Sequence, residues 1–237
     1  MHLHLPKPLH GWRALFGEIG IIVVGVLIAL SAEQLVQALH WRAEVRDFRQ
    51  AVDHELALDL GTYRYTMSVR PCVTRRLAEL ETWLQRSKDG RVVPLTGSIG
   101  LPAAVSQYTS VWENKDDQVM AHLPMAVRLQ YAELYDEFRN TDLVKATERD
   151  TWRGMAGYDG TEPLEHQDRI LLRGLVSRAE GLNTVMIGNY GVAVRLGRKL
   201  GLTPIDDPLA PRPAADRTFC GPLIRAAHES AAARDPR

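Results

Sequence analysis

The sequence predicts an all-α protein, in which a single amino-terminal transmembrane helix continues as an amphipathic stalk into a bundle of four to six helices. Three observations support this fold class. An uncharged, apolar run at residues 19–32 lies between Glu18 and Glu33. Beyond it, apolar residues recur at intervals of three and four, the period of a helix with one buried face. The longest such pattern, residues 164–200, would form a helix of about 55 Å.

The apolar run is short for a membrane span, because a hydrocarbon core of about 30 Å needs about 20 apolar residues. Its flanks extend it. Trp12 with Arg13 precedes the run and Trp41 with Arg42 follows it. As a helix, Trp12 to Trp41 would span about 43 Å, close to a bilayer with its headgroups, and Trp favours that interface. We therefore predict a tail at residues 1–14, a transmembrane helix at 15–39, and these four residues as interfacial anchors in the lipid bilayer.

Two other interpretations of this segment remain open: a cleaved signal peptide with a site near residues 29–31, and the core helix of a soluble domain. Glu18 adjoins the apolar run and the helical pattern passes through the would-be cleavage site, which favours the anchor. Basic residues are nearly balanced on the two sides. A large domain after a short tail is most simply a signal anchor. The expected location is the inner (cytoplasmic) membrane, single-pass, with the carboxy-terminal domain in the periplasm.

One face of the predicted span is small and acidic. Glu18, Gly25, Ala29 and Glu33 are spaced by 7, 4 and 4 residues and fall within about 80° of arc on a helix. Small residues at this spacing allow close helix approach, and a carboxylate within the membrane needs a partner or the headgroups. We hypothesise that this stripe contacts another membrane helix, from a second copy or a different protein. The alternative is that both glutamates simply lie at the interfaces.

The next elements follow from periodicity and proline. The stalk is indicated by Trp41, Val45, Phe48, Val52 and Leu56, which recur at helical spacing. Pro71 is expected to open or kink the next helix, which should end at residues 89–90, Asp-Gly. Pro102 predicts a short helix through residue 112, and Pro124 predicts another with an apolar face. The bundle domain is thus expected at residues 40–202, and a Pro/Ala-rich tail at 203–237.

The last helix contains an unusual glycine repeat. Gly174, Gly181 and Gly188 recur every seven residues, and each costs about 1 kcal/mol of helix propensity relative to alanine. We predict that they permit close helix packing, with the stalk as the neighbour. The alternative is a break in the helix near residues 188–191.

Cys72 and Cys220 are the only cysteines. A distant pair makes no metal site, and in an oxidising compartment it would form a disulfide that pins the tail. Two free buried thiols are the alternative.

Composition and motifs exclude several function classes. Twenty-nine basic and 29 acidic residues give a net charge of zero, so no long-range field favours nucleic acid. The sequence contains no HExxH, GxSxG, P-loop or GxGxxG motif. Residues 53–55, Asp-His-Glu, combine an imidazole with carboxylates, but consecutive residues point to different helix faces, which favours a solvated surface. We expect no enzymatic activity, catalytic residue, cofactor or metal.

Residues 10–42, HGWRALFGEIGIIVVGVLIALSAEQLVQALHWR, resemble the start of an uncharacterised family of bacterial proteins with one amino-terminal membrane helix and a helical domain. Residues 72–80 (CVTRRLAEL), 110–112 (SVW) and 128–135 (RLQYAELY) resemble later parts of that family. The resemblance implies an anchor and an all-helical domain, and it implies no catalytic residue.

The expected function is a membrane-anchored, non-enzymatic scaffold or accessory subunit of a membrane protein complex, in contact with another membrane protein or a homo-oligomer. A periplasmic ligand-sensing helical bundle is the alternative, and a helical hydrolase or metal enzyme is the third possibility. A closed apolar interior would favour the first, and convergent buried polar groups the second.

Overall fold

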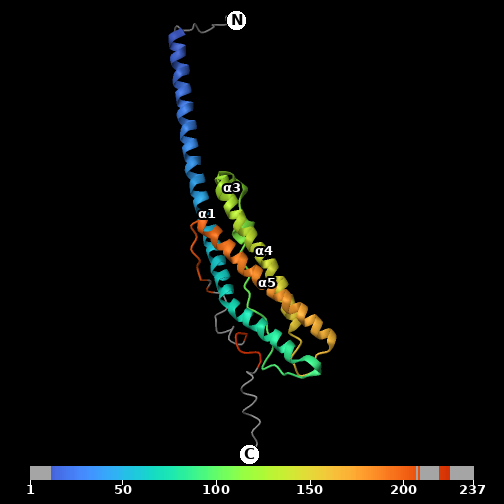
Figure 1. Cartoon of the computed structure of the whole chain (residues 1–237). Helices are drawn as coiled ribbons and strands as arrows, with labels where there is room; N and C mark the ends of the chain where they lie inside the picture. Colours follow the sequence, from blue (N-terminus) through green and yellow to red (C-terminus); the bar gives the residue numbers. More distant parts are fainter. Residues whose placement is uncertain (1–11, 207, 209–218, 225–237) are drawn as a thin grey trace, which may run out of the picture. The chain divides into compact units, whose positions relative to one another are not determined.

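The protein is all-helical, as predicted. The computed structural model describes residues 12–206, 208 and 219–224 (Figure 1). It is 76% helical, with five α-helices and no strand in this described part. The elements are α1 (Trp12–Arg86), a 3-10 turn η1 (Lys88–Gly90), α2 (Ser110–Glu113), α3 (Asp117–His122), α4 (Met125–Met155) and α5 (His166–Lys199).

The chain divides into two compact units. The first contains residues 1–50 and 116–123, and the second contains residues 51–115 and 124–237. Helix α1 begins in the first unit and continues in the second. The expected change from span to stalk therefore occurs within one uninterrupted helix.

The first unit consists of the amino-terminal part of α1 and the short helix α3. Asp116 caps α3 by accepting hydrogen bonds from the backbone N–H groups of Gln118 and Val119. The ring of His122, at the end of α3, stacks on Trp41 of α1 with 4.4 Å between centroids. This contact ties α3 to the segment of α1 that follows the apolar run.

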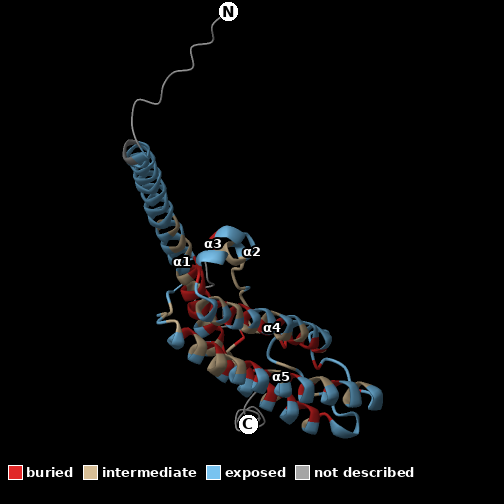
Figure 2. Cartoon of the chain, turned by 90° about the horizontal axis from the view of Figure 1, so that it is seen from above, coloured by how far each residue is buried: buried red, intermediate tan, exposed pale blue. Residues whose placement is uncertain are grey.

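The second unit is a bundle of α1, α4 and α5, and Figure 2 shows their buried residues in red. Its largest hydrophobic cluster joins all three helices with the segment after α1 and the carboxy-terminal segment 219–224. Fully or nearly buried members include Val73, Leu80 and Trp83 of α1, Trp152 and Met155 of α4, Leu172 and Val176 of α5, and Ile99, Phe219 and Leu223. Apolar area removed from water contributes about 25 cal/mol per Å², so the burial of this cluster stabilises the bundle.

Pro71 does not open a new helix, contrary to the expectation from sequence. It lies on the exposed side of α1, inside a helix that runs from Trp12 to Arg86. A proline in a helix interior lacks one N–H and crowds the carbonyl four residues earlier, at a cost of about 3 kcal/mol. Its neighbours compensate, because Val69 and Val73 enter the hydrophobic cluster and Arg70 makes a buried ion pair.

The segment before α2 also differs from the prediction. Residues 102–109 are not helical, and α2 is a single turn that begins at Ser110. Buried acidic groups of α1 bind the backbone N–H of Tyr108 in this segment and that of Val111 in the following turn, α2. These tertiary hydrogen bonds replace the local ones that a helix would supply.

The two later helices are longer or more regular than expected. Helix α4, which the sequence predicted after Pro124, continues for 31 residues to Met155. Helix α5 is unbroken from His166 to Lys199, so the alternative of a break near residues 188–191 is wrong. Positive φ occurs at Gly201, directly after the C-cap residue Leu200 of α5, where glycine ends the helix; in η1, which follows α1, it occurs at Asp89 and Gly90.

Candidate functional site

The predicted membrane contact stripe lies on an uncovered part of α1. Glu18, Gly25, Ala29 and Glu33 are all exposed, and no atom lies within 4 Å of a Cβ built on Gly25. Gln37 donates a hydrogen bond to Glu33 from the next turn. Whether the stripe binds another helix stays a prediction.

Of the predicted interfacial anchors, Trp12 and Arg42 are exposed, whereas Trp41 is half-buried beneath His122. The side chain of Arg13 lies outside the described residues. The tryptophan after the apolar run therefore has a contact within the protein, and its position at a membrane interface stays a prediction. Sequence spacing did not indicate this contact, because His122 is distant in the chain.

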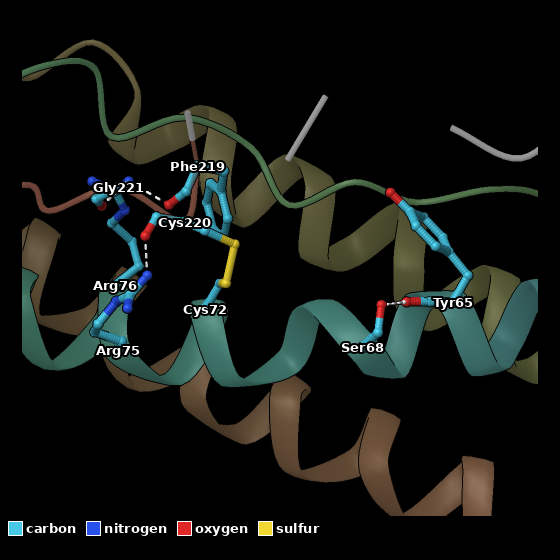
Figure 3. Close-up of a disulfide and its surroundings, with 8 residues drawn as sticks. All are labelled: Tyr65, Ser68, Cys72, Arg75, Arg76, Phe219, Cys220 and Gly221. Carbon is cyan, nitrogen blue, oxygen red and sulfur yellow. Dashed lines mark hydrogen bonds between the residues drawn. A yellow bond between two sulfur atoms is a disulfide. The ribbon is translucent and has the colours of Figure 1, made fainter. Parts of the chain in front are cut away.

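The cysteine pair joins the end of the chain to α1. Cys72 and Cys220 form a disulfide in the structure, with Cα atoms 5.0 Å apart (Figure 3). Arg76 donates to the carbonyls of Phe219 and Gly221, and Arg75 donates to that of Cys220. Glu79 accepts from the backbone N–H of Leu223. The bond thus fastens a segment that already fits its site, and the alternative of two free thiols does not apply to this structure.

The glycine repeat of α5 is not packed against the stalk, so this prediction was wrong within the chain. Gly174, Gly181 and Gly188 are exposed, and a Cβ built on any of them meets nothing within 4 Å. The buried face of α5 is instead Leu172, Val176, Ala179, Asn183, Met186, Ala193 and Gly197. The reason is the rotation of α5 about its axis, which places the three glycines on the side that faces away from the bundle.

Close helix approach occurs at other glycines. A Cβ on Gly197 would lie 2.6 Å from a methyl group of Leu60, and one on Gly61 would lie 1.7 Å from the carbonyl oxygen of Ile205. The backbone N–H of Ile205 donates to Ala57 at 2.9 Å. These contacts bring α5 and the segment after it onto α1.

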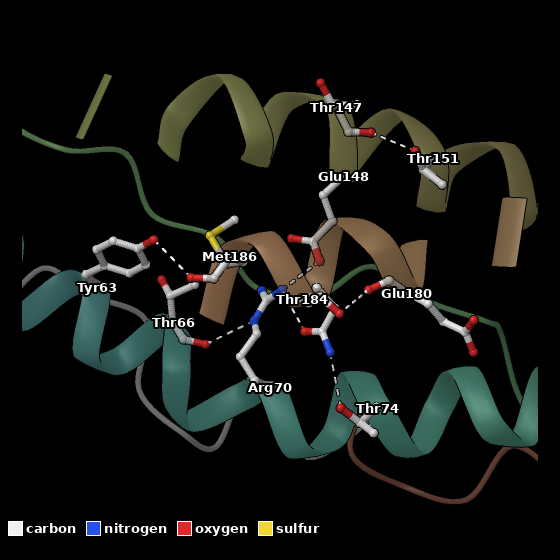
Figure 4. Close-up of polar contacts among 11 residues, drawn as sticks. Tyr63, Thr66, Arg70, Thr74, Thr147, Glu148, Thr151, Glu180, Thr184 and Met186 are labelled. Carbon is white, nitrogen blue, oxygen red and sulfur yellow. Dashed lines mark hydrogen bonds and ion pairs between the residues drawn. The ribbon is translucent and has the colours of Figure 1, made fainter. Parts of the chain in front are cut away.

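A polar ladder crosses the interior of the bundle, and no sequence motif indicated it. Arg70 of α1 and Glu148 of α4 form an ion pair with 2.6 Å between nitrogen and oxygen, and their side chains are 4% and 2% exposed (Figure 4). Arg70 also donates to Asn183 of α5 at 3.4 Å, and Asn183 donates to Thr74. Tyr63 extends the ladder by donating to the carbonyl of Met186 and accepting from Thr141.

The second part of the ladder holds the segment before α2. Glu55 accepts hydrogen bonds from Tyr135 of α4 at 2.7 Å, from Ser110 at 3.1 Å and from the backbone N–H of Val111 at 2.9 Å. Trp112 then stacks on Tyr135 with 4.9 Å between centroids. The interpretation of residues 53–55 as a solvated face is therefore wrong for Glu55, which is buried.

Asp59 and Lys145 bind the same segment one turn further along. Asp59 accepts from the backbone N–H of Tyr108 at 2.7 Å, and Lys145 donates to the carbonyl of Val105 at 2.7 Å and to Gln107 at 2.6 Å. Burial raises the pKa of Asp59 to about 8, and the neighbouring charge of Glu55 adds to the rise. Burial also lowers the pKa of Lys145 from its ordinary value.

The sequence analysis did not identify the residues of the polar ladder, because each of them has partners that are distant in the sequence. Glu55 and Tyr135 are separated by 80 residues, and Arg70 and Asn183 by 113. One signal was available: Glu55, Asp59, Thr62 and Thr66 recur at helical spacing on the side of α1 that also carries buried apolar residues. A polar stripe of this kind on an apolar face indicates a buried network rather than a solvated surface.

Within the described residues, one helix, α1, is long and apolar enough to cross a membrane, and the bundle has a hydrophobic core that also contains a buried polar network. The apolar window of α1 is not buried at all, unlike the core helix of a soluble domain. Among the residues described, no three histidine, cysteine or acidic groups are arranged to hold a metal ion. No protein-family model, curated protein or solved structure matches this chain.

Proposed function

We propose that this protein is a membrane-anchored, non-enzymatic scaffold or accessory subunit of a membrane protein complex. The observation that carries the proposal is the uncovered first part of α1, whose apolar window is exposed throughout. An apolar helix surface of this extent needs lipid or protein around it. The stripe of Glu18, Gly25, Ala29 and Glu33 is the part least suited to lipid, because it carries carboxylates and small residues.

The stripe would contact another membrane helix, either in a second copy or in a different protein. Gly25 lies near its centre, where the missing side chain lets a partner backbone approach. The anchor would lie in the inner membrane with the bundle in the periplasm, because a large domain after a short tail is most simply a signal anchor. The disulfide supports an exported bundle, since such bonds persist in oxidising compartments. The resemblance to an uncharacterised family of bacterial anchored proteins is part of this proposal.

A matched pair of variants tests the contact face. Gly25→Leu adds a side chain on the stripe, whereas Gly20→Leu adds the same side chain on a different face of the same apolar run. The tagged full-length chain is purified in mild detergent, and the mass of the complex and of its companions is measured. We expect Gly25→Leu to reduce assembly at least severalfold and Gly20→Leu to preserve it. A wild-type chain that is a monodisperse monomer without companions would refute the scaffold function.

A periplasmic ligand-sensing bundle is a second candidate, and the polar ladder favours it. Oδ2 of Asp59 and Oγ1 of Thr62 are buried and make no hydrogen bond within the described part of the chain. Buried polar groups of this kind are costly unless they are satisfied. A bundle that senses a small polar molecule would unfold at a higher temperature in its presence. A screen of polar metabolites by thermal unfolding of the full-length protein tests this function.

A further inference from the structure

Three buried ionisable side chains from two helices hold one short segment of the bundle. This segment, residues 105–111, is called the latch segment here. Glu55 and Asp59 of α1 bind its backbone N–H groups at Val111 and Tyr108. From α4, Lys145 binds its carbonyl at Val105. The segment has no regular secondary structure before Ser110, and these three side chains supply tertiary hydrogen bonds in place of local ones.

Lys145 and Asp59, two of the side chains that bind the latch segment, differ in the protonation state that their contacts favour. Lys145 is 4% exposed and makes three hydrogen bonds, to Val105, Gln107 and Asp142, which use the three N–H groups of an ammonium. Asp59 is 0% exposed and accepts one hydrogen bond, through Oδ1. Its Oδ2 has no hydrogen-bond partner in the described chain. A negative charge on Asp59 is therefore poorly solvated.

Asp59 also faces other acidic groups. Glu55 lies one turn away on α1, Asp142 lies on α4, and the hydroxyl of Tyr135 on α4 responds to the charge of Asp59. Lys145 and the Tyr108 N–H are the opposing favourable groups. A proton on Asp59 removes the repulsion from Glu55 and leaves the hydrogen bond from Tyr108 intact, because a protonated carboxyl still accepts.

We propose that Asp59, Glu55 and Lys145 form a pH-sensitive latch, which holds the latch segment while Asp59 is protonated and releases it when Asp59 ionises. The latch does not depend on a membrane partner, so it can be tested independently of the proposed scaffold function. It would make the proton itself a ligand of the bundle.

The direction of the response follows from linkage. Burial raises the pKa of Asp59 from 3.8 to about 8, so the closed state binds the proton more tightly than the open one. The contribution of Asp59 is fully present below about pH 4 and is lost as the pH rises through about 8. The lowered pKa of Lys145 acts in the opposite sense, because the open state then binds its proton more tightly. Release on alkalinisation therefore requires Asp59.

Hydrogen exchange of the full-length protein in mild detergent measures the release. Amides of residues 105–113 are followed between pH 6 and 9.5, with the intrinsic exchange rate divided out. We expect protection to fall as the pH rises towards about 8, by up to tenfold per pH unit for one proton, and to level off above that pH. In Asp59→Asn this fall should be absent. Asp136→Asn, which changes an exposed carboxylate of α4, should retain the wild-type profile.

Glu55→Gln provides a second test that needs no change at Asp59. Because the charge of Glu55 raises the pKa of Asp59, its removal should lower the pH at which protection stops falling. A residue with a merely structural role would lower protection at every pH without moving this levelling-off pH. If Asp59→Asn does not fold, the shift of the levelling-off pH in Glu55→Gln decides. Constant protection of the wild type across the range, release on acidification, or an unshifted levelling-off pH in Glu55→Gln would overturn the proposal.

Discussion

The buried ion pair between Arg70 and Glu148 offers the sharpest test of the bundle interior. Both side chains are almost wholly buried, and Arg70 holds three elements together through Glu148, Asn183 and the carbonyl of Thr66. Removing one partner of such a pair leaves an uncompensated charge and costs about 3–5 kcal/mol. Replacing both by methionine removes that penalty, so Arg70→Met/Glu148→Met should be close to wild type or more stable.

The magnitude sets the assay. For a chain of this size, 1 kcal/mol shifts the unfolding temperature by about 2–4 °C, so each single variant should unfold about 6–20 °C below wild type. Circular dichroism of the full-length protein in mild detergent records this shift, and urea titration gives the free energies for a double-mutant cycle. The exposed pair Arg139 and Asp136 is the control, and Arg139→Met should cost less than about 1 kcal/mol. Single variants of Arg70 and Glu148 that each cost under about 1 kcal/mol, or a double variant as unstable as their sum, would refute the reasoning.

The same glycine substitution should have opposite effects at two positions of α5. Gly181→Ala fills open space on an exposed helix face and should stabilise by about 0.5–1 kcal/mol, whereas Gly197→Ala meets Leu60 and should destabilise by about 1–3 kcal/mol. Urea unfolding compares them, and a destabilising Gly181→Ala would reveal that this face is covered in the native assembly. The disulfide of Cys72 and Cys220 closes a loop of 148 residues, for which loop entropy gives about 5 kcal/mol. The double serine variant should therefore unfold at a lower temperature, and identical unfolding of wild type with and without a reducing agent would contradict a bonded pair.

Periodicity predicted the helices well where apolar spacing was regular. The helix predicted after Pro124 does have an apolar face, on which Tyr131, Leu134, Tyr135 and Phe138 of α4 are buried. Periodicity failed where a single residue was taken to interrupt a helix, at Pro71. There the burial of Val69 and Val73 outweighs the local cost of the proline. Rules based on neighbouring residues do not include the free energy of tertiary burial.

The glycine repeat shows a different limit. A seven-residue repeat places Gly174, Gly181 and Gly188 on one face, but spacing alone does not say whether that face turns inward. The phase is set by the larger residues Leu172, Val176 and Met186, which bury more apolar area. Gly197, which does permit a close approach, stands outside the repeat.

The sequence by itself determined that the chain is helical and that one segment is apolar enough to cross a bilayer, because both properties depend on neighbouring residues. Only the tertiary structure decided which charges are buried. Glu55, Asp59 and Arg70 look like ordinary polar residues of an amphipathic helix until α4 supplies Tyr135, Lys145 and Glu148. The residues that surround these side chains are distant in the sequence. Burial changes the free energy of a charged group far more than its neighbours in the sequence do.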